Sequence, residues 1–452
     1  MKRTKVKIHV SASLSPDGSV VMLSDSLVKK WKLSQNPSVS LCFGSAKQEV
    51  KVIPVTQAGM LRLSDTLAAK WGVKHGDSLC LQYKSASGSL HLGPLIGVMV
   101  SRANASAGDK LFGTTTAFCH EMTEACKTYG AAVFFCTPED LKTAGDTVKG
   151  WHYAGRWIRS TFPVPHILYN RLTSRRYENY PHVQQFVSQA RSKHRTIMFN
   201  EKYLNKSEVF DALRKEAGLQ TYLPESHLLR NFAMLKSMCS KYASVFLKPI
   251  TGSLGKGIIR IRRSEGGTYV AHFTGLNGTR KQVYRSLTQL YSAISGKVKT
   301  GRHQIQQGLN LIQAGGRPID FRALVQRDDT GSWTVTSIVG RIAGNHQFVS
   351  NLARGGTLCT VREALARAGA SAAGAARLKR AALQIAKGIE TQVEGHFAEL
   401  GVDLALDTSG RVWLLEVNSK PSKDDNTPLN AERKIRPSVK TVVQYARHAA
   451  KF

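Results

Sequence analysis

The chain of 452 residues lacks long hydrophobic runs and paired cysteines. No segment reaches about eighteen consecutive apolar residues, so the sequence predicts no membrane span. Residues 1–7 are basic, but no apolar run follows them, which argues against a secretory signal peptide. The seven cysteines are an odd number without a CxxC pair. We therefore expect reduced, buried thiols in a soluble, cytoplasmic protein.

Acidic residues are scarce as well, because 31 Asp and Glu stand against 64 Lys and Arg, a formal charge of +33. Such an excess attracts polyanions such as nucleic acid, phosphate-rich substrates or anionic polymers. The basic residues are spread over the whole chain, without RGG repeats, lysine tracts or basic heptads. A solvated basic surface is therefore favoured over nucleic-acid binding. The 42% of hydrophobic residues can build several cores, and the length predicts about two to four domains.

An internal repeat occupies the N-terminal part of the chain. The sequence LSDSLVKKW at 23–31 recurs as LSDTLAAKW at 63–71, and each copy predicts a short capped helix followed by alternating strands. Because units of this length cannot each bury a core, we expect residues 1–92 to close into one all-β barrel. Trp31 and Trp71 hold the same repeat position and are expected to pair in its core. The barrel shows no catalytic pattern and is interpreted as a binding or scaffolding module.

The pattern changes to α/β after the barrel. Apolar strand patterns at 95–100 and 131–136 flank a helical pattern around 115–129, an order that predicts parallel strands. The helix contains CHE at 119–121 and Cys126. Their spacing fits no zinc-binding pattern, so we expect a helix with buried thiols instead of a metal site.

A glycine-rich turn lies between two predicted strands at 245–250 and 257–260. The residues of interest in this turn are Gly252, Ser253, Gly255, Lys256 and Gly257. Glycines leave backbone N–H groups free to approach a phosphate chain, and Lys248 on the incoming strand can reach the same anions. The turn is not a Walker A loop, because a β-branched strand follows it where that loop opens a helix. An ordinary hairpin is the alternative.

Asp320, Arg322 and Arg354 form a second candidate group. Alternation along a strand places Asp320 and Arg322 on one face. The pair could be a surface salt bridge, which contributes little, or it could hold a ribose hydroxyl and an anionic substrate. Arg354 precedes two glycines and is typical of a second anion clamp.

The most specific pattern is a predicted β-hairpin at 401–418, with its turn at 407–410. Asp403 lies on the first strand, whereas Glu416 and Asn418 lie two residues apart on the second, on one face. Closing the hairpin brings three oxygen-bearing side chains together on an otherwise apolar sheet. Buried carboxylates need a compensating cation, and this ligand set suits Mg²⁺ bridged to phosphates.

In combination, these motifs resemble the ATP-grasp superfamily. More closely, the chain resembles the YheC/YheD family of endospore coat-associated ATP-grasp proteins, over roughly residues 90–440. The segments that carry the resemblance are LGPLIG at 92–97, YNR at 169–171, GSLGKG at 252–257, SNLARGG at 350–356 and EVNSKP at 416–421.

The resemblance implies roles for the lid side of the site. Lys248 and Lys206 would bind ATP phosphates, together with the glycine-rich turn. Gln306, Gln307 and Leu309 would line the hinge beside adenine. Many superfamily members carry acids at this hinge, but a glutamine carbonyl can still accept the amino proton.

For the opposite side of the site, the resemblance implies a ribose contact for Asp320. Arg322 and Arg354 would clamp the substrate or an acyl phosphate. The implied magnesium ligands are Asp403, Glu416 and Asn418.

The implied fold class is α/β, an α+β ATP-grasp fold preceded by a small α/β pre-grasp domain and the two-repeat barrel. The expected domains are the barrel at 1–92, the pre-grasp domain at 93–200, the ATP-grasp domain at 201–430 with a lid at about 221–310, and a basic C-terminal helix or tail at 431–452.

The implied activity is ATP-dependent ligation of a carboxylate to an amine or thiol through an acyl phosphate. ATP and Mg²⁺ are the expected cofactors, and the substrates would be an unidentified carboxylate and amine, with a peptide or anionic polymer as candidates. The alternative is a structural protein of the spore surface that binds nucleotide without turnover. Spore-coat proteins are then candidate partners, and an anionic polymer explains the charge better than DNA.

Overall fold

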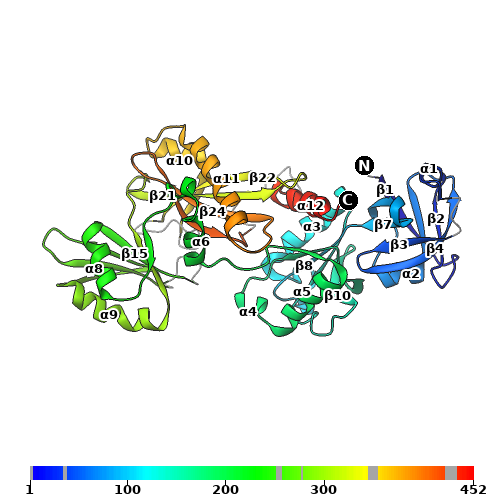
Figure 1. Cartoon of the computed structure of the whole chain (residues 1–452), viewed down its shortest axis with the longest axis horizontal. Coiled ribbons are helices and arrows are strands. Elements are labelled where there is room, and N and C mark those ends of the chain that lie inside the picture. The colour runs from blue at the N-terminus through cyan, green and yellow to red at the C-terminus, as the bar shows by residue number, and fades with distance from the viewer. Residues whose placement is uncertain (1–3, 34–37, 251–256, 276–277, 345–354, 423–434) are drawn as a thin grey trace.

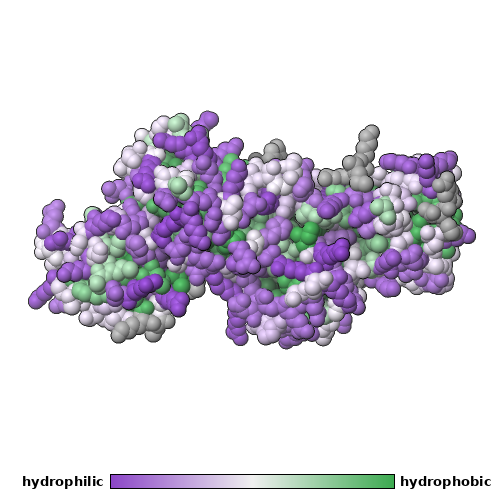
Figure 2. All heavy atoms as spheres, in the orientation of Figure 1, coloured by the Kyte–Doolittle hydropathy of each residue, from purple (hydrophilic) through white to green (hydrophobic). Residues whose placement is uncertain are grey.

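The computed structural model describes residues 4–33, 38–250, 257–275, 278–344, 355–422 and 435–452. Four sheets follow one another along an elongated molecule (Figure 1). Hydrophilic residues cover most of the face seen in Figure 2. Among the described residues, no helix combines the length and apolar composition needed to cross a membrane.

The N-terminal sheet is a closed barrel with the strand order β1-β5-β2-β4-β3-β7-β6. Its elements are β1 (Thr4–Ser11), β2 (Val20–Ser24), α1 (Asp25–Lys30), β3 (Val39–Phe43), β4 (Ala46–Val55), β5 (Met60–Ser64), α2 (Asp65–Trp71), β6 (Ser78–Lys84) and β7 (Ser89–Gly93). The strand–helix pair β2–α1 thus recurs as β5–α2 at the repeat offset. Buried apolar side chains of both copies form one core.

The two repeat tryptophans do not pair with each other, and that prediction is wrong. Trp71 is fully buried and stacks on Phe43, with ring centroids 5.8 Å apart. Trp31 is half-buried and stacks on Tyr83 at 6.2 Å. Each tryptophan therefore contacts an aromatic residue of the other copy, because the copies interdigitate when the barrel closes.

The second sheet has the order β11-β10-β9-β8-β12-β13. Its elements are β8 (Leu95–Met99), α3 (Thr116–Tyr129), β9 (Ala132–Cys136), β10 (Thr147–Tyr153), β11 (Trp157–Pro163), β12 (Ile167–Asn170), α4 (Arg175–Glu178), α5 (Pro181–His194) and β13 (Ile197–Phe199). The predicted parallel pairing of β8 with β9 is confirmed. Cys119 and Cys126 are buried thiols on α3, and burial raises the pKa of both.

The third sheet, called the lid sheet here, has the order β14-β19-β15-β16-β17-β18. Its elements are β14 (Ser226–Leu228), α8 (Phe232–Lys241), β15 (Ser244–Pro249), β16 (Ile259–Arg263), β17 (Tyr269–Gly275), β18 (Gly278–Tyr284), α9 (Leu287–Thr300) and β19 (His303–Gln307). Helices α8 and α9 cover one face and share a core with side chains such as Val245, Ile261 and Ala271. The opposite face carries Lys248.

The fourth sheet, called the central sheet, has the order β23-β22-β21-β24-β25, and β20 pairs with β21. Its elements are β20 (Gln313–Ala314), β21 (Arg317–Arg327), β22 (Trp333–Ile342), β23 (Thr357–Thr360), α10 (Val361–Arg367), α11 (Gly374–Gln392), β24 (Glu399–Leu406) and β25 (Val412–Asn418). The amphipathic helix α11 covers one face, where Phe321, Val402 and Leu414 are buried. Polar side chains occupy the other face.

Two connections tie the sheets together. Helices α6 (Lys206–Leu213) and α7 (Ala217–Gln220) lead from the second sheet to the lid sheet, and both contact α11. Helix α12 (Pro437–Ala449) returns to pack against α3 and β21 (Figure 1). Its buried residues include Val439 and Val443, so the C-terminal segment is a packed helix. The domain boundaries proposed from the sequence stay a prediction.

Candidate nucleotide and metal site

A row of charged side chains crosses the polar face of the central sheet. The strand register pairs Arg322 on β21 with Asp403 on β24, and Asp403 with Glu416 on β25. Directly opposed residues of antiparallel strands share a face, so the three side chains line up across the sheet. The predicted β-hairpin at 401–418 is confirmed by this pairing.

Asp403 is held by guanidinium groups. Both of its carboxylate oxygens accept hydrogen bonds from Arg322, and Arg341 on β22 lies 3.2 Å from Oδ1. Burial opposes ionisation, but Arg322 and Arg341 outweigh it and lower the pKa of Asp403. The sequence pattern predicts a metal ion as the compensating charge for this carboxylate. The structure shows that arginine already compensates its charge.

Asp320 and Arg322 do share a face, but they do not form a surface salt bridge with each other. Both are about nine-tenths buried, at 8% and 9% exposure. Arg341 Nε donates to Asp320 Oδ1 at 2.6 Å, whereas Arg322 turns to Asp403. Despite its burial, Arg341 has a raised pKa because of the carboxylates of Asp320 and Asp403. The result is a buried network of two acids and two arginines.

Gly401 makes room for the loop that follows β25. It pairs with Asn418 in the register, and a Cβ atom added to it would lie 3.5 Å from Arg322 Nη1 and 2.9 Å from the Cβ of Pro421. A larger residue at position 401 would therefore displace the loop after β25.

Glu416 and Asn418 offer a carboxylate and an amide oxygen at the end of β25. Both are half-buried and two residues apart, hence on one face. The described residues contain no group of three His, Cys, Asp or Glu side chains placed to hold a metal ion. The candidate set has two carboxylates and one amide, so phosphate oxygens would have to complete it. Oxygen donors of this kind fit Mg²⁺.

Lys206 reaches the same place from α6. Asn205 caps this helix by accepting a hydrogen bond from the N–H of Ser207 at 2.9 Å. The cap orients Lys206, the first helical residue, so that its Nζ lies 3.5 Å from Glu416 Oε1. A lysine far away in the sequence thus adjoins the candidate metal ligand.

Lys248 enters the site from the lid sheet. Its Nζ donates to Gln306 Oε1 at 2.5 Å. Burial and, to a smaller extent, the nearby Lys206 lower the pKa of Lys248 to about 8, although the carboxylates of Glu416, Asp403 and Asp320 oppose the shift. These electrostatic neighbours show that the lid lysine faces the acids of the central sheet.

The predicted hinge residues lie at the end of β19 and just after it. Gln306 Nε2 donates to Ser226 Oγ at 3.0 Å, and Gln307 Oε1 accepts from the N–H of Glu225 at 2.7 Å. The side-chain carbonyl of Gln306 accepts from Lys248, and that of Gln307 accepts from Glu225. Both glutamine carbonyls are therefore already engaged in a hydrogen bond. Leu309 is half-buried in the segment that leads to β20. Gln306, Gln307 and Leu309 thus lie where the two sheets connect, and their contact with adenine stays a prediction.

Part of the predicted site lies outside the described residues. These positions are Gly252, Ser253, Gly255, Lys256 and Arg354. Gly257, at the end of the glycine-rich turn, has a φ of 71° and lies against Pro249. This positive φ is a conformation that favours glycine.

Sequence similarity to known proteins shows the family of the chain. The family described as YheC/D like ATP-grasp matches residues 195–448, more than half of the chain. The chain belongs to the YheC/D-like ATP-grasp family. It is 27% identical over 336 residues to the endospore coat-associated protein YheD of Bacillus subtilis, covering 74% of each chain.

A second relative is the endospore coat-associated protein YheC of the same organism, 21% identical over 323 residues, which covers 70% of this chain and 87% of that one. Among solved structures, the VanG D-Ala:D-Ser ligase from Enterococcus faecalis gives a TM-score of 0.48 at 11% identity, covering 79% of this chain and 99% of that chain. A structural likeness at this level carries no functional argument.

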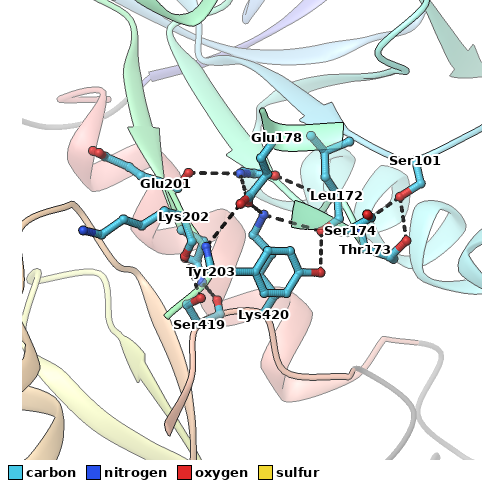
Figure 3. A network of polar contacts seen from close by, with 12 residues as sticks. Ser101, Leu172, Thr173, Ser174, Glu178, Glu201, Lys202, Tyr203, Ser419 and Lys420 are labelled. Carbon is cyan, nitrogen blue, oxygen red and sulfur yellow. Dashed lines mark hydrogen bonds and ion pairs between the residues drawn. The ribbon is translucent and has the colours of Figure 1, made fainter. Parts of the chain in front are cut away.

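This YheC/D-like ATP-grasp chain also has a buried polar network next to the site, which the sequence pattern did not predict. Figure 3 shows Lys420 and Glu178 pointing toward each other beside Tyr203, and the two form an ion pair. The Lys420 ammonium lies 4.5 Å from the centre of the Tyr203 ring. Lys420 follows Asn418 by two residues, so the network connects the end of β25 to α4 of the second sheet.

A neighbouring pair strengthens the same connection. Arg171 Nη1 lies 3.2 Å from Glu399 Oε1, and Nη2 donates to the carbonyl of Pro421 at 3.0 Å. Arg171 belongs to the family motif YNR and Pro421 to the family motif EVNSKP. Only the packing of the two sheets shows that these two motifs contact each other.

Proposed function

We propose that this protein is an ATP-dependent ligase that joins a carboxylate to an amine or a thiol. The observation that carries the proposal is the meeting of Lys248, Lys206 and Glu416, which come from the lid sheet, α6 and the central sheet. Two cations opposite a carboxylate–amide pair suit the phosphates of a nucleotide bound with a divalent cation.

Each group has a distinct role in the proposed reaction. Lys248 and Lys206 bind the phosphates, and Asp320 lies near the ribose. Glu416, Asn418 and Asp403 would hold Mg²⁺, which supplies charge neutralisation at the phosphates when bound. Because Asp403 is engaged by Arg322, Glu416 and Asn418 are the more accessible ligands. Arg322 is buried in the network, so it would act mainly by fixing Asp403.

The proposed chemistry has two steps. A substrate carboxylate oxygen attacks the γ-phosphorus of ATP, which breaks the bond to ADP and forms an acyl phosphate. The amine or thiol then attacks the acyl carbon and releases phosphate, so that a C–N or C–S bond forms. The positive side chains hold the developing charge, and catalysis consists of positioning and electrostatic stabilisation.

The test is calorimetric titration with Mg-ATP, followed by a screen of carboxylate and amine pairs for phosphate release. Glu416→Ala should abolish release, whereas Glu394→Ala, an exposed acid of the same domain, should leave it unchanged. Failure of the unaltered protein to bind Mg-ATP at millimolar concentration would refute the proposal.

A second candidate is a coat-associated protein that binds nucleotide without turnover, in line with the names of the two Bacillus relatives. Tight Mg-ATP binding together with a negative screen over broad carboxylate and amine pairs would favour it.

A further inference from the structure

The acidic residues of the chain are unevenly distributed. Residues 226–310, which contain the lid sheet, have fourteen Lys and Arg and one acidic residue, Glu265. This segment therefore carries +13 of the formal +33. The candidate nucleotide site uses only a few of these charges. Nucleotide binding therefore does not account for most of the positive charge of this segment.

One row of side chains crosses the lid sheet on the face opposite α8 and α9. In strand order the row consists of Gln306, Phe246, Arg260, His272 and Lys281. Neighbouring strands lie about 4.8 Å apart, so the row extends about 19 Å from the hinge side to the sheet edge at β18. Its first two members adjoin Lys248, whose ammonium lies 5.8 Å from the Phe246 ring centre. The row thus begins at the nucleotide site and leads away from it.

Arg260, Arg262 and Lys281, the cations of this face away from Lys248, have no carboxylate partner among the described residues. Arg262, two residues after Arg260 on β16, is exposed on the same face. The ion pairs of the described lid residues use Glu225, and none includes Arg260, Arg262 or Lys281. The Nε atom of Arg260 is buried and has no hydrogen-bond partner among the described residues.

The like charges of these groups disfavour one another's protonated forms. Burial lowers the pKa of Arg260, and the like charge of Arg262 adds to the shift. Burial likewise lowers the pKa of His272, with further contributions from Arg260, Lys281 and Arg262. No anionic group appears among these influences. An anion lying along the row would relieve the repulsion.

We propose that this row binds an extended acidic polypeptide segment of the ligase substrate and leads it to the nucleotide site. The inference rests on the proposed function. Guanidinium groups pair with carboxylates in a two-pronged geometry, which suits Arg260 and Arg262. Grooves that bind single-stranded nucleic acid combine cations with exposed aromatic side chains on which the bases stack. Phe246 is half-buried, with Lys248 and Arg260 both over its ring, so the row favours carboxylates over bases.

The experiment measures binding of labelled poly-L-glutamate and of a single-stranded oligonucleotide to the full chain by fluorescence anisotropy. Arg262→Glu/Lys281→Glu reverses two exposed charges of the row. The control Lys236→Glu/Arg285→Glu makes the same charge change at exposed positions, one on α8 and one just before α9, away from the row. Mg-ATP affinity, measured in parallel, shows that each variant is folded.

The row variant should weaken poly-L-glutamate binding about tenfold or more, and the control less than about twofold. Equal losses in both variants would mean that only net charge matters, which overturns the proposal. Tighter binding of the oligonucleotide through the same residues would overturn it in favour of nucleic acid. Normal Mg-ATP binding without poly-L-glutamate binding would refute this inference alone, whereas absent Mg-ATP binding would refute the proposed function.

Discussion

The two sheets that face the candidate site treat charge in opposite ways. On the central sheet, Arg322 and Arg341 lie against the carboxylates of Asp403 and Asp320. On the lid sheet, Lys248 donates to a neutral glutamine, and Arg260 and Arg262 have no ion pair among the described residues. The buried acids and arginines of the central sheet are therefore paired before any ligand binds, whereas Arg260 and Arg262 of the lid sheet have no anionic partner among the described residues. We infer that the buried ion pairs fix the geometry of the site, and that the cations without an ion pair supply affinity for an anionic ligand.

The largest expected effect is on the central sheet. Arg322→Met should lower the free energy of unfolding by about 3–5 kcal/mol, because it leaves the buried Asp403 carboxylate without its two-pronged partner. Urea denaturation followed by circular dichroism measures this loss. The double variant Arg322→Met/Asp403→Leu should recover part of it. A loss below about 1 kcal/mol would show that Arg341 alone balances Asp403.

On the lid sheet, Lys248→Met should act on affinity instead of stability. We expect Mg-ATP binding to weaken about a hundredfold, equivalent to about 2.7 kcal/mol, because a phosphate-binding cation is lost. The unfolding free energy should stay equal or rise, since a poorly solvated ammonium is removed. Lys236→Met on the exposed side of α8 is the matched control. Equal calorimetric affinities of the two variants would exclude a phosphate contact for Lys248.

The pH dependence of Mg-ATP affinity provides a second test of the phosphate contact of Lys248. The pKa of about 8 for Lys248 lies below the ordinary 10.5, so Lys248 of the free protein loses its proton at a lower pH than an ordinary lysine. Mg-ATP affinity should then fall above about pH 8 by up to tenfold per pH unit, and Lys248→Met should abolish this dependence. Because the folded state binds this proton less tightly than the unfolded state, the contribution of Lys248 to stability should improve as the pH rises from about 8 toward 10.5. A flat affinity profile in the unaltered protein would contradict the assignment.

The smallest effect is expected at an exposed ion pair. Lys29 Nζ lies 2.6 Å from Asp25 Oδ2 on the barrel, and the two side chains are 76% and 39% exposed. Asp25→Asn should change the unfolding free energy by less than about 1 kcal/mol, since solvent and salt screen the pair. Thermal unfolding at low and high salt measures the difference. A loss as large as that of Arg322→Met would remove the contrast between exposed and buried pairs.

Local pattern was sufficient for much of the site. Alternation of apolar and polar residues predicted the hairpin that carries Asp403 and Glu416, and it placed Asp320 and Arg322 on one face. Those predictions hold because strand periodicity is local and the hairpin turn is short. The magnesium role of the acids stays a prediction.

The ion-pair partners of these residues could not be predicted from local strand periodicity. Arg341 reaches Asp320 through the pairing of β21 with β22, whose register shifts at a bulge between Leu324 and Val325. Lys420 and Glu178 are 242 residues apart in the chain. Pairing Trp31 with Trp71 failed for a related reason, because the repeat offset does not reveal how two copies interdigitate.

The sequence by itself determined the family, the order of strands and helices in the site, and the residue types available to hold phosphate and a divalent cation. Only the tertiary structure decided which charges are already neutralised. A carboxylate in an apolar strand demands a cation, but the strand does not say whether an arginine from a neighbouring strand or a bound ion provides it. Here the register of β21 with β24 pairs Asp403 with Arg322, and among the described residues no strand of the lid sheet places a carboxylate beside Arg260, Arg262 or Lys281, because charge compensation depends on contacts between segments that are distant in the chain.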